Sequence, residues 1–242
     1  MSASSASSTP AHGILHAPTA WLFSSIGKKT VVAVTGIALV LFVIGHLLGN
    51  LTFFFGPESI NSYAMHLRDL GPLLWVARIG LLGAVGLHIF FTMLVWKENQ
   101  TAKPQKYAVP APIKTTVFAR TMRLTGLIVL AFIVFHLAHF TLWLIDPNYA
   151  SYHATVDGHE VHDVYRMVVT GFSNPFVSIF YIISLALVAS HLSHGIGSLF
   201  QTLGITSQRM RPVYETSGKV LAWALFVGYA AIPISVLLGL GK

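Results

Sequence analysis

Five long runs of apolar residues, separated by short polar segments, dominate the pattern of hydrophobic and polar positions along the chain. They cover residues 30–55, 73–96, 118–145, 175–200 and 218–240. Each run is long enough for a helix to cross a hydrocarbon core about 30 Å thick, and runs of this length are typical of membrane helices. The pattern therefore predicts an all-α fold, a polytopic membrane protein with five transmembrane helices that are surrounded by membrane lipid.

The polar segments contain the glycines and prolines that end helices, but none resembles a linker between independently folding domains. The first residues are rich in serine, alanine and histidine. Residues 21–29 combine aromatic side chains with two lysines, as in a segment at a membrane surface. We therefore expect residues 1–29 to form a cytoplasmic tail with an interfacial lead-in, and residues 30–242 to form one five-helix domain.

Composition and charge support a membrane location and predict an orientation. Only 10% of the residues are charged, against about 25% in soluble domains. If the five runs span the membrane, eleven of the 15 lysines and arginines lie on the side of the N-terminus and four on the other side. The positive-inside rule then predicts a cytoplasmic N-terminus and a C-terminus outside the cytoplasm. The chain has a formal net charge of +7, and its basic excess lies on the predicted cytoplasmic face. Because the orientation accounts for this excess, we expect no nucleic-acid partner.

Histidine has the most informative distribution of any residue type. The chain has 12 histidines and no cysteine, which excludes thiolate metal sites and cysteine-held iron–sulfur clusters from it. Each of the first four runs has a histidine well inside its apolar stretch, and the fifth run has none. Because an ionisable side chain in hydrocarbon is costly, such residues mark candidate functional sites. The four are His46, His88, His136 and His191.

Depth divides these four histidines into two pairs. Because successive helices run in opposite directions, His46 and His136 lie in the outer half of the membrane. His88 and His191 lie in the inner half, about 15 Å away along the membrane normal. Two imidazoles at one level on different helices match the axial ligands of a haem, and with both positions filled the expected chemistry is electron transfer. The first four helices are therefore predicted to form a bundle that binds two b-type haems.

Neighbouring residues extend this hypothesis. Small residues beside the histidines would let a flat macrocycle approach the backbone, although glycine also serves for close helix packing. They are Gly45, Gly49, Gly86, Gly195 and Gly197. Arginines at the helix ends are candidates for pairing with haem propionates, with interfacial anchoring as the alternative. They are Arg78, Arg120 and Arg123.

Other histidines have less definite roles. His139 and His194 each lie three residues after a predicted ligand, and we expect them to contact a propionate, water or a quinone. The alternative is that either of them is itself the ligand. His153, His159 and His162 lie in an acidic loop between the third and fourth runs, which we expect to be solvated and not to bind a metal.

Several motifs resemble those of a known family. They are Ser24-Ser25-Ile26-Gly27-Lys28-Lys29, Gly45-His46-Leu47-Leu48-Gly49-Asn50, Pro72-Leu73-Leu74-Trp75-Val76-Ala77-Arg78, Phe135-His136-Leu137 and His191-Leu192-Ser193-His194-Gly195. With five helices and one histidine on each of the first four, the chain resembles the di-haem cytochrome b subunit of succinate dehydrogenase and fumarate reductase. The resemblance extends from residue 21 to the end of the fifth run.

The resemblance implies a single-polypeptide anchor of complex II in the bacterial inner (cytoplasmic) membrane. A flavoprotein subunit would oxidise succinate, and an iron–sulfur subunit would dock on the basic cytoplasmic face of this chain. Electrons would then pass through the inner and outer haems to a quinone, commonly menaquinone in such relatives, and a higher oligomer is compatible with this arrangement. The family's His-x-Ser-x-Gly pattern favours His191 over His194 as the ligand. Ala189 stands where some fumarate-reducing relatives carry a glutamate, which favours succinate oxidation.

The quinone site and the partner remain open at this point. Asn50, Glu58 and His139 are the polar candidates near the outer haem, and Ser24 and Ser25 are the candidates for a cytoplasmic site. The competing functions are a di-haem anchor for another respiratory dehydrogenase, of the hydrogenase or formate dehydrogenase type, and a histidine-using ion transporter. A transporter would favour acidic residues beside the membrane histidines, and the apolar runs contain none in their cores. A haem-free structural anchor is the remaining alternative.

Overall fold

The computed structural model describes residues 17–101 and 117–241, with the backbone alone for residues 17, 18 and 117–120. The elements are α1 (Ala17–Leu22), α2 (Ser25–Leu51), η2 (Thr52–Phe55), α3 (Pro57–Asp69), α4 (Pro72–Thr101), α5 (Val117–Phe140), η3 (Pro147–Ser151), β1 (His153–Val156), β2 (His159–His162), α6 (Val164–Ser173), α7 (Pro175–Thr202) and α8 (Arg211–Leu237). Within the described ranges, five helices are long and apolar enough to cross a membrane: α2 with η2, α4, α5, α7 and α8. The prediction of a helical, polytopic membrane protein is therefore confirmed at the level of helix length and composition.

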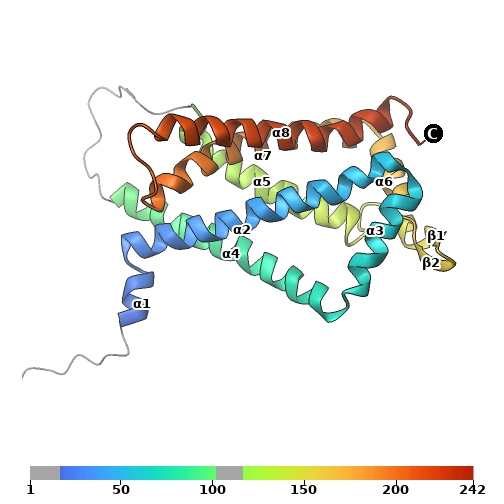
Figure 1. The fold of residues 1–242 in the computed structure, drawn as a ribbon, viewed down its shortest axis with the longest axis horizontal. Coiled ribbons are helices and arrows are strands. Elements are labelled where there is room, and N and C mark those ends of the chain that lie inside the picture. The colour runs from blue at the N-terminus through green and yellow to red at the C-terminus, as the bar shows by residue number, and fades with distance from the viewer. Residues whose placement is uncertain (1–16, 102–116, 242) are drawn as a thin grey trace, which may run out of the picture.

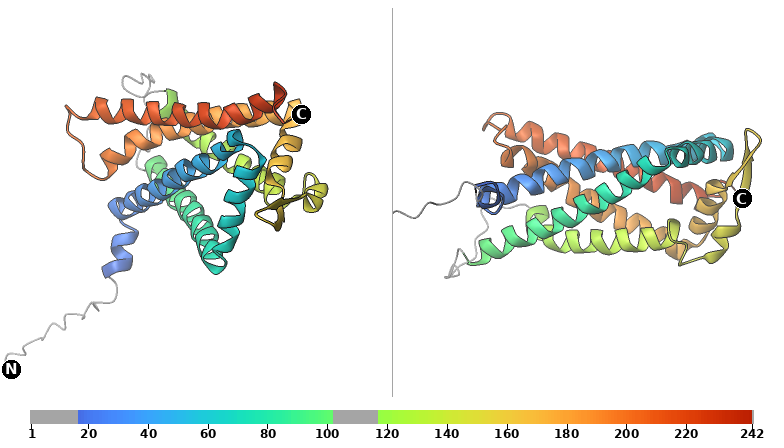
Figure 2. Two further views of the ribbon diagram at one scale, coloured as in Figure 1. Left: turned by 45° about the vertical axis from the view of Figure 1, so that its right-hand side comes forward. Right: turned by 90° about the horizontal axis from the view of Figure 1, so that it is seen from below.

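The bundle of five long helices has two unlike ends (Figures 1 and 2). One end, which we call the hairpin end, carries η2, α3, η3, the two strands, α6 and the last described residues. The other end, which we call the N-terminal end, carries α1 and the connection from α7 to α8. The positive-inside rule predicts that the N-terminal end faces the cytoplasm.

Local sequence determines where three of the long helices begin. Ser24 caps α2 and Asn174 caps α7, because each side chain accepts a hydrogen bond from an amide in the first turn. α4 begins at Pro72, directly after Gly71, whose φ of 53° is a left-handed value that favours glycine. Proline suits a first turn because it has no amide proton to leave unpaired. The predicted starts of the second and fourth runs therefore lie within one residue of α4 and α7.

α5 ends earlier than the third apolar run predicts. The run continues to residue 145, but the helix ends at Phe140. The amides of Thr141 and Leu142 both donate to the Leu137 carbonyl, a pattern that closes a helix by satisfying its last carbonyl groups. Trp143 then has a φ of 55°, so the chain leaves the helix axis. Hydropathy did not reveal this end because the residues beyond it are still apolar.

A short β-hairpin occupies the segment that was predicted to be a solvated loop. β1 pairs antiparallel with β2, with His153 opposite His162 and Val156 opposite His159. The turn is Asp157-Gly158, and both residues have positive φ, as a two-residue hairpin turn requires. The all-α prediction is therefore correct for the membrane part and omitted this hairpin, whose four-residue strands are too short to recognise by alternation.

The side chain of His162 gives the hairpin a pH-dependent stability. It is buried, and its ring stacks on Trp143 with 4.8 Å between centroids. Its Nε2 has no hydrogen-bond partner among the described residues. Burial lowers the pKa of His162 below its ordinary value; Arg68 and His153 lower it further, whereas Asp163 and a backbone hydrogen bond raise it.

We expect the hairpin to open more readily at acidic pH. The unfolded hairpin binds a proton to His162 more readily than the folded one, so its stability is complete at neutral pH and decreases as the pH falls below about 6.5. Hydrogen–deuterium exchange of residues 153–162 at about pH 7.5 and about pH 5, corrected for intrinsic exchange rates, measures the effect. His162→Phe should remove the pH dependence while keeping the stack on Trp143, and an unchanged dependence in that variant would contradict the assignment.

Helix packing is closest between α7 and α8, with α2 against α4 and α5 against α7. Glycine permits the close approach of α8: a Cβ added at Gly218 would lie 3.1 Å from Ile196 of α7, and one at Gly228 would lie 2.8 Å from Leu47 of α2. A buried apolar cluster lies at the hairpin end, where α3 and α6 pack against the long helices. It comprises Phe53, Ile60, Phe172, Tyr181, Ile232 and Val236.

An ion pair joins α2 to α4 at the N-terminal end. It connects Lys28 with Glu98, and the Lys28 side chain is only 7% exposed. The interfacial lead-in was predicted to place its lysines at the water boundary. Lys29 is exposed as expected, but Lys28 is buried because the α4 carboxylate neutralises it.

Candidate functional site

His46 and His136 are brought together near the hairpin end of the bundle. His46 lies on α2 and His136 on α5, and their ring centroids are 5.9 Å apart with 80° between the ring planes. With metal–nitrogen bonds of about 2 Å and about 1 Å from nitrogen to ring centroid, two imidazoles on opposite sides of one metal ion have centroids about 6 Å apart. The pair therefore has the separation that two axial ligands need.

His88 and His191 each contact a threonine of a neighbouring helix. Nδ1 of His88, on α4, lies 3.1 Å from Thr35 Oγ1 and 3.2 Å from the Val32 carbonyl oxygen, both on α2. Nδ1 of His191, on α7, lies 3.3 Å from Thr125 Oγ1 on α5. The two histidines also interact electrostatically with each other.

Backbone carbonyls determine which ring nitrogen carries the proton. The Val32 carbonyl, 3.2 Å from Nδ1 of His88, can only accept, so Nδ1 of His88 donates to it. The backbone of Met122 on α5 likewise hydrogen-bonds to His191. Each of the two histidines therefore holds its proton on Nδ1. The unprotonated Nε2 is the form in which histidine binds metals.

These contacts also place the two pairs at different levels. His88 lies beside Thr35, eleven residues before His46 along α2, which corresponds to about 16 Å of helix. His191 lies beside Thr125, eleven residues before His136 along α5. His46 and His136 are thus nearer the hairpin end, and the other pair is nearer the N-terminal end.

The four histidines belong to an internal repeat. In both halves of the chain a threonine precedes the first histidine by eleven residues, and a proline at a helix start precedes the second histidine by sixteen. The halves contain Thr35, His46, Pro72 and His88, and Thr125, His136, Pro175 and His191. Each pair takes one histidine from each half, which explains why the two levels have matching surroundings.

The predicted glycines divide into two groups. A Cβ added at Gly45, Gly86 or Gly195 would meet no atom within 4 Å, so open space adjoins these positions. A Cβ at Gly49 would overlap the Tyr63 ring, and one at Gly197 would lie 3.4 Å from Glu215. The last two therefore serve helix packing, and the first three do not. Gly45 and Gly86 are exposed positions, so a flat ligand beside them stays a prediction. Four imidazoles on four helices are a donor set that suits haem iron, and His46 and His136 have the separation for it.

Both ring nitrogens of His139 are occupied. The residue is 1% exposed, its Nδ1 lies 3.0 Å from the Tyr181 hydroxyl, and its Nε2 lies 3.1 Å from the Tyr149 hydroxyl. The Tyr181 hydroxyl also lies 3.5 Å from Nδ1 of His136. Burial, with Asp146 nearby, raises the pKa of Tyr149 to about 12, so its hydroxyl stays protonated. This arrangement favours His136 over His139 as the ligand. Contact of His139 with a quinone or a propionate stays a prediction, and it would require one of the two tyrosine hydroxyls to leave its ring nitrogen.

The arginines lie against tryptophans. The Arg78 guanidinium is 5.1 Å from the Trp75 ring centroid, and that of Arg123 is 4.8 Å from the Trp96 ring centroid. Such stacking is typical of anchors at a membrane interface, and pairing with propionates stays a prediction. The side chain of Arg120 lies outside the described residues.

His194 and the quinone candidates are distributed over both ends of the bundle. His194 interacts electrostatically with Glu215 of α8. At the N-terminal end, Ser24 caps α2 and Ser25 is exposed. At the hairpin end, the Asn50 carboxamide donates to the His46 carbonyl at 2.9 Å, and Glu58 is exposed in the first turn of α3. The structure does not bring these candidates together, and quinone binding by any of them stays a prediction.

Sequence reasoning missed the residues that orient the inner histidines. Thr35 and Thr125 were not among the candidates, nor were Gly36 and Gly126, which follow them. A Cβ at Gly36 would lie 3.4 Å from His88 Cε1, and one at Gly126 would lie 3.3 Å from His191 Cε1, so each Thr-Gly pair receives one imidazole. The repeated eleven-residue spacing was the signal that identifies them.

No protein-family model, curated protein or solved structure matches the chain.

Proposed function

We propose that the chain is the di-haem membrane anchor and electron-transfer subunit of a succinate:quinone oxidoreductase. The observation that carries the proposal is the arrangement of four membrane histidines in two cross-helix pairs at two levels. The resemblance of the motifs supplies the rest: a flavoprotein and an iron–sulfur subunit as partners, and menaquinone as the acceptor. On this proposal the succinate chemistry belongs to the soluble partners.

The residues of this chain hold and orient the two groups. His46 and His136 would hold one haem, and His88 and His191 the other. Contacts with Val32 and Thr35 hold the His88 ring, and a contact with Thr125 holds the His191 ring, so that Nε2 of each would be available to iron. A haem held by two histidines would supply one-electron transfer and no oxygen chemistry.

The N-terminal end is the proposed docking face for the soluble partners. The exposed basic residues of the described chain there are Lys29, Lys97, Arg123, Arg209, Arg211 and Lys219. A basic surface favours and steers a partner with an acidic face, and the positive-inside rule places this end in the bacterial cytoplasm. A di-haem anchor of another dehydrogenase would use the same histidines, so co-purification of the soluble partner separates these two functions.

The first experiment is a dithionite-reduced-minus-oxidised spectrum of the purified chain with a pyridine haemochrome count. We expect two b-type haems per chain, both low-spin and both indifferent to carbon monoxide, because no axial position is free. A chain that purifies folded without haem, or with a haem that binds carbon monoxide, would contradict the proposal. Addition of haem to the folded, haem-free protein is the control for loss during purification.

A further inference from the structure

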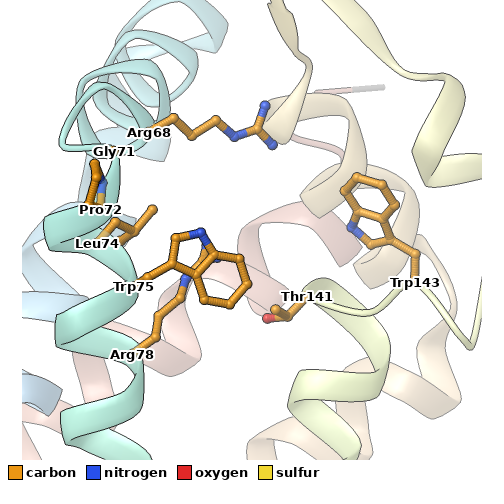
Figure 3. Close-up of a pocket in the computed structure, with 8 residues that line it drawn as sticks. All are labelled: Arg68, Gly71, Pro72, Leu74, Trp75, Arg78, Thr141 and Trp143. Carbon is orange, nitrogen blue, oxygen red and sulfur yellow. The ribbon is translucent and has the colours of Figure 1, made fainter.

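A cavity of about 730 Å³ lies at the hairpin end, between the start of α4 and the end of α5 (Figure 3). Arg68, Gly71, Trp75 and Arg78 form its wall on the side of α3 and α4. Thr141 and Trp143, which follow α5, form the opposite wall. α2, which carries His46, does not line it. The cavity is therefore separate from the helix that supplies one ligand of the nearer histidine pair.

The cavity is cationic. Arg68 and Arg78 both line it, and neither forms an ion pair with a carboxylate in the described part of the chain. No acidic residue lines it. The first amides of α4 are occupied, because Leu73 donates to the Leu70 carbonyl and Leu74 donates to the Gly71 carbonyl. The positive charge of the cavity therefore comes from the two guanidinium groups.

The opposite wall adds one accessible hydrogen-bond donor. Thr141 is exposed, and its side chain lies between the two walls in Figure 3. Trp143 also lines the cavity, but its indole nitrogen is covered by protein atoms, so its ring contributes an aromatic surface and not a donor.

The surroundings of the cavity are those of a lipid surface. Leu73 and Val76 of α4 are 61% and 65% exposed, and Leu142 and Leu144 beyond α5 are 61% and 70% exposed. These apolar side chains flank the cationic cavity at the end of the membrane helices, where tryptophan belts and phospholipid headgroups meet. A ligand that satisfies both features carries an anion and hydrocarbon chains. Two guanidinium groups favour an anion over a neutral quinone, because hydrogen bonds between two charged groups are the stronger ones.

We propose that this cavity binds the phosphodiester headgroup of an anionic glycerophospholipid, with the acyl chains lying along the exposed face of α4. Arg68 and Arg78 pair with the phosphate, and the Thr141 hydroxyl donates a hydrogen bond to it. Binding through Arg68 does not require the haems of the proposed function. It would occupy the leaflet at the hairpin end, which the positive-inside rule places outside the cytoplasm.

The test uses the full chain, purified in a zwitterionic detergent and titrated with short-chain phosphatidylglycerol, with binding followed by native mass spectrometry. Phosphatidylcholine with the same chains tests the charge, and glycerol 3-phosphate tests the acyl chains. We expect phosphatidylglycerol to bind more tightly than either. Equal binding of phosphatidylcholine would overturn the cationic site, and equal binding of glycerol 3-phosphate would show a site for free phosphate.

Arg68→Gln is the main variant, because Arg78 is also a predicted propionate contact. One lost cationic contact at a membrane surface corresponds to about a fivefold loss of affinity for phosphatidylglycerol. Arg166→Gln is the matched control: Arg166 is an exposed arginine near the same end, stacked 4.3 Å from the Tyr152 ring centroid, and it does not line the cavity. We expect the control to bind as the wild type does. Equal affinity of the Arg68→Gln protein and the control would overturn the proposal.

A second variant protects the test against misfolding. Thr141→Asp places a carboxylate in the cavity at an exposed position and should also weaken phosphatidylglycerol binding, at least as much as Arg68→Gln. The absorption spectrum of any bound haem is recorded for both variants. An altered haem spectrum with unchanged lipid binding would show that the cavity belongs to a haem propionate, and would overturn the lipid assignment. Absence of haem from the wild type would contradict the proposed function alone.

Discussion

His191→Ala is expected to lose the haem that His191 shares with His88, so that the haem content falls from two to one per chain. The variant removes the nitrogen that the proposal assigns to the haem iron; the ring lies against Thr125 and Gly126 of α5. The pyridine haemochrome count measures the loss. If the chain is the proposed anchor, the same variant should also stop electron transfer from the soluble dehydrogenase to quinone, since one of the two proposed carriers would be absent.

His194→Ala is the matched control for that variant. It removes the same side chain one turn further along α7, where His194 interacts electrostatically with Glu215 of α8 as well as with His191. We expect it to retain both haems. Two normal low-spin haems in the His191→Ala protein would refute the assignment of the ligand, and loss of a haem in the His194→Ala protein alone would transfer the role to His194.

His139→Ala is expected to destabilise the protein on the order of 1–3 kcal/mol without removing a haem. The substitution leaves the Tyr149 hydroxyl without its partner, whereas the Tyr181 hydroxyl keeps His136 at 3.5 Å, and one unsatisfied buried group costs about 1–3 kcal/mol. Denaturant unfolding in detergent micelles, followed by circular dichroism, measures the free energy. The haemochrome count on the same sample should stay at two, because the proposal assigns His136, and not His139, as the ligand.

His153→Ala is the control for this effect. His153 is an exposed histidine on β1 whose only ion-pair partner among the described residues is Glu160, so its loss should change the free energy of unfolding by no more than about 0.5 kcal/mol. Equal destabilisation by His139→Ala and His153→Ala would show that the buried network does not support the fold. Loss of a haem from the His139→Ala protein would instead favour the alternative ligand.

The internal repeat connects these predictions. The two levels of histidines are built from equivalent positions, yet their surroundings differ. The inner histidines contact threonines, whereas Nδ1 of His136 lies 3.5 Å from the hydroxyl of Tyr181, which also contacts His139. His139 has no equivalent in the first half, where Gly49 occupies the corresponding position and accommodates Tyr63. The second half of the repeat has therefore acquired a buried polar network that joins α5 and α7 to η3.

The sequence by itself determined the five membrane helices, the histidine on each of the first four, and the division of those histidines into two levels. These properties depend on contiguous hydropathy, on helix rise and on alternating direction, all of which are fixed along one chain. Breakers such as Gly71 with Pro72, and Asn174 with Pro175, likewise determined where α4 and α7 begin.

Only the tertiary structure decided what each polar side chain contacts. It placed Thr35 and Thr125 in contact with the inner histidines, and it placed a tyrosine hydroxyl at each ring nitrogen of His139. It also ended α5 at Phe140 within an apolar run, and placed Arg68 beside the cavity that reaches Trp143. The physical reason is that hydropathy is nearly the same for every rotation of an apolar helix, whereas a hydrogen bond between helices depends on rotation and relative height within about 1 Å. Those two quantities are set by packing between helices and are absent from any single run of residues.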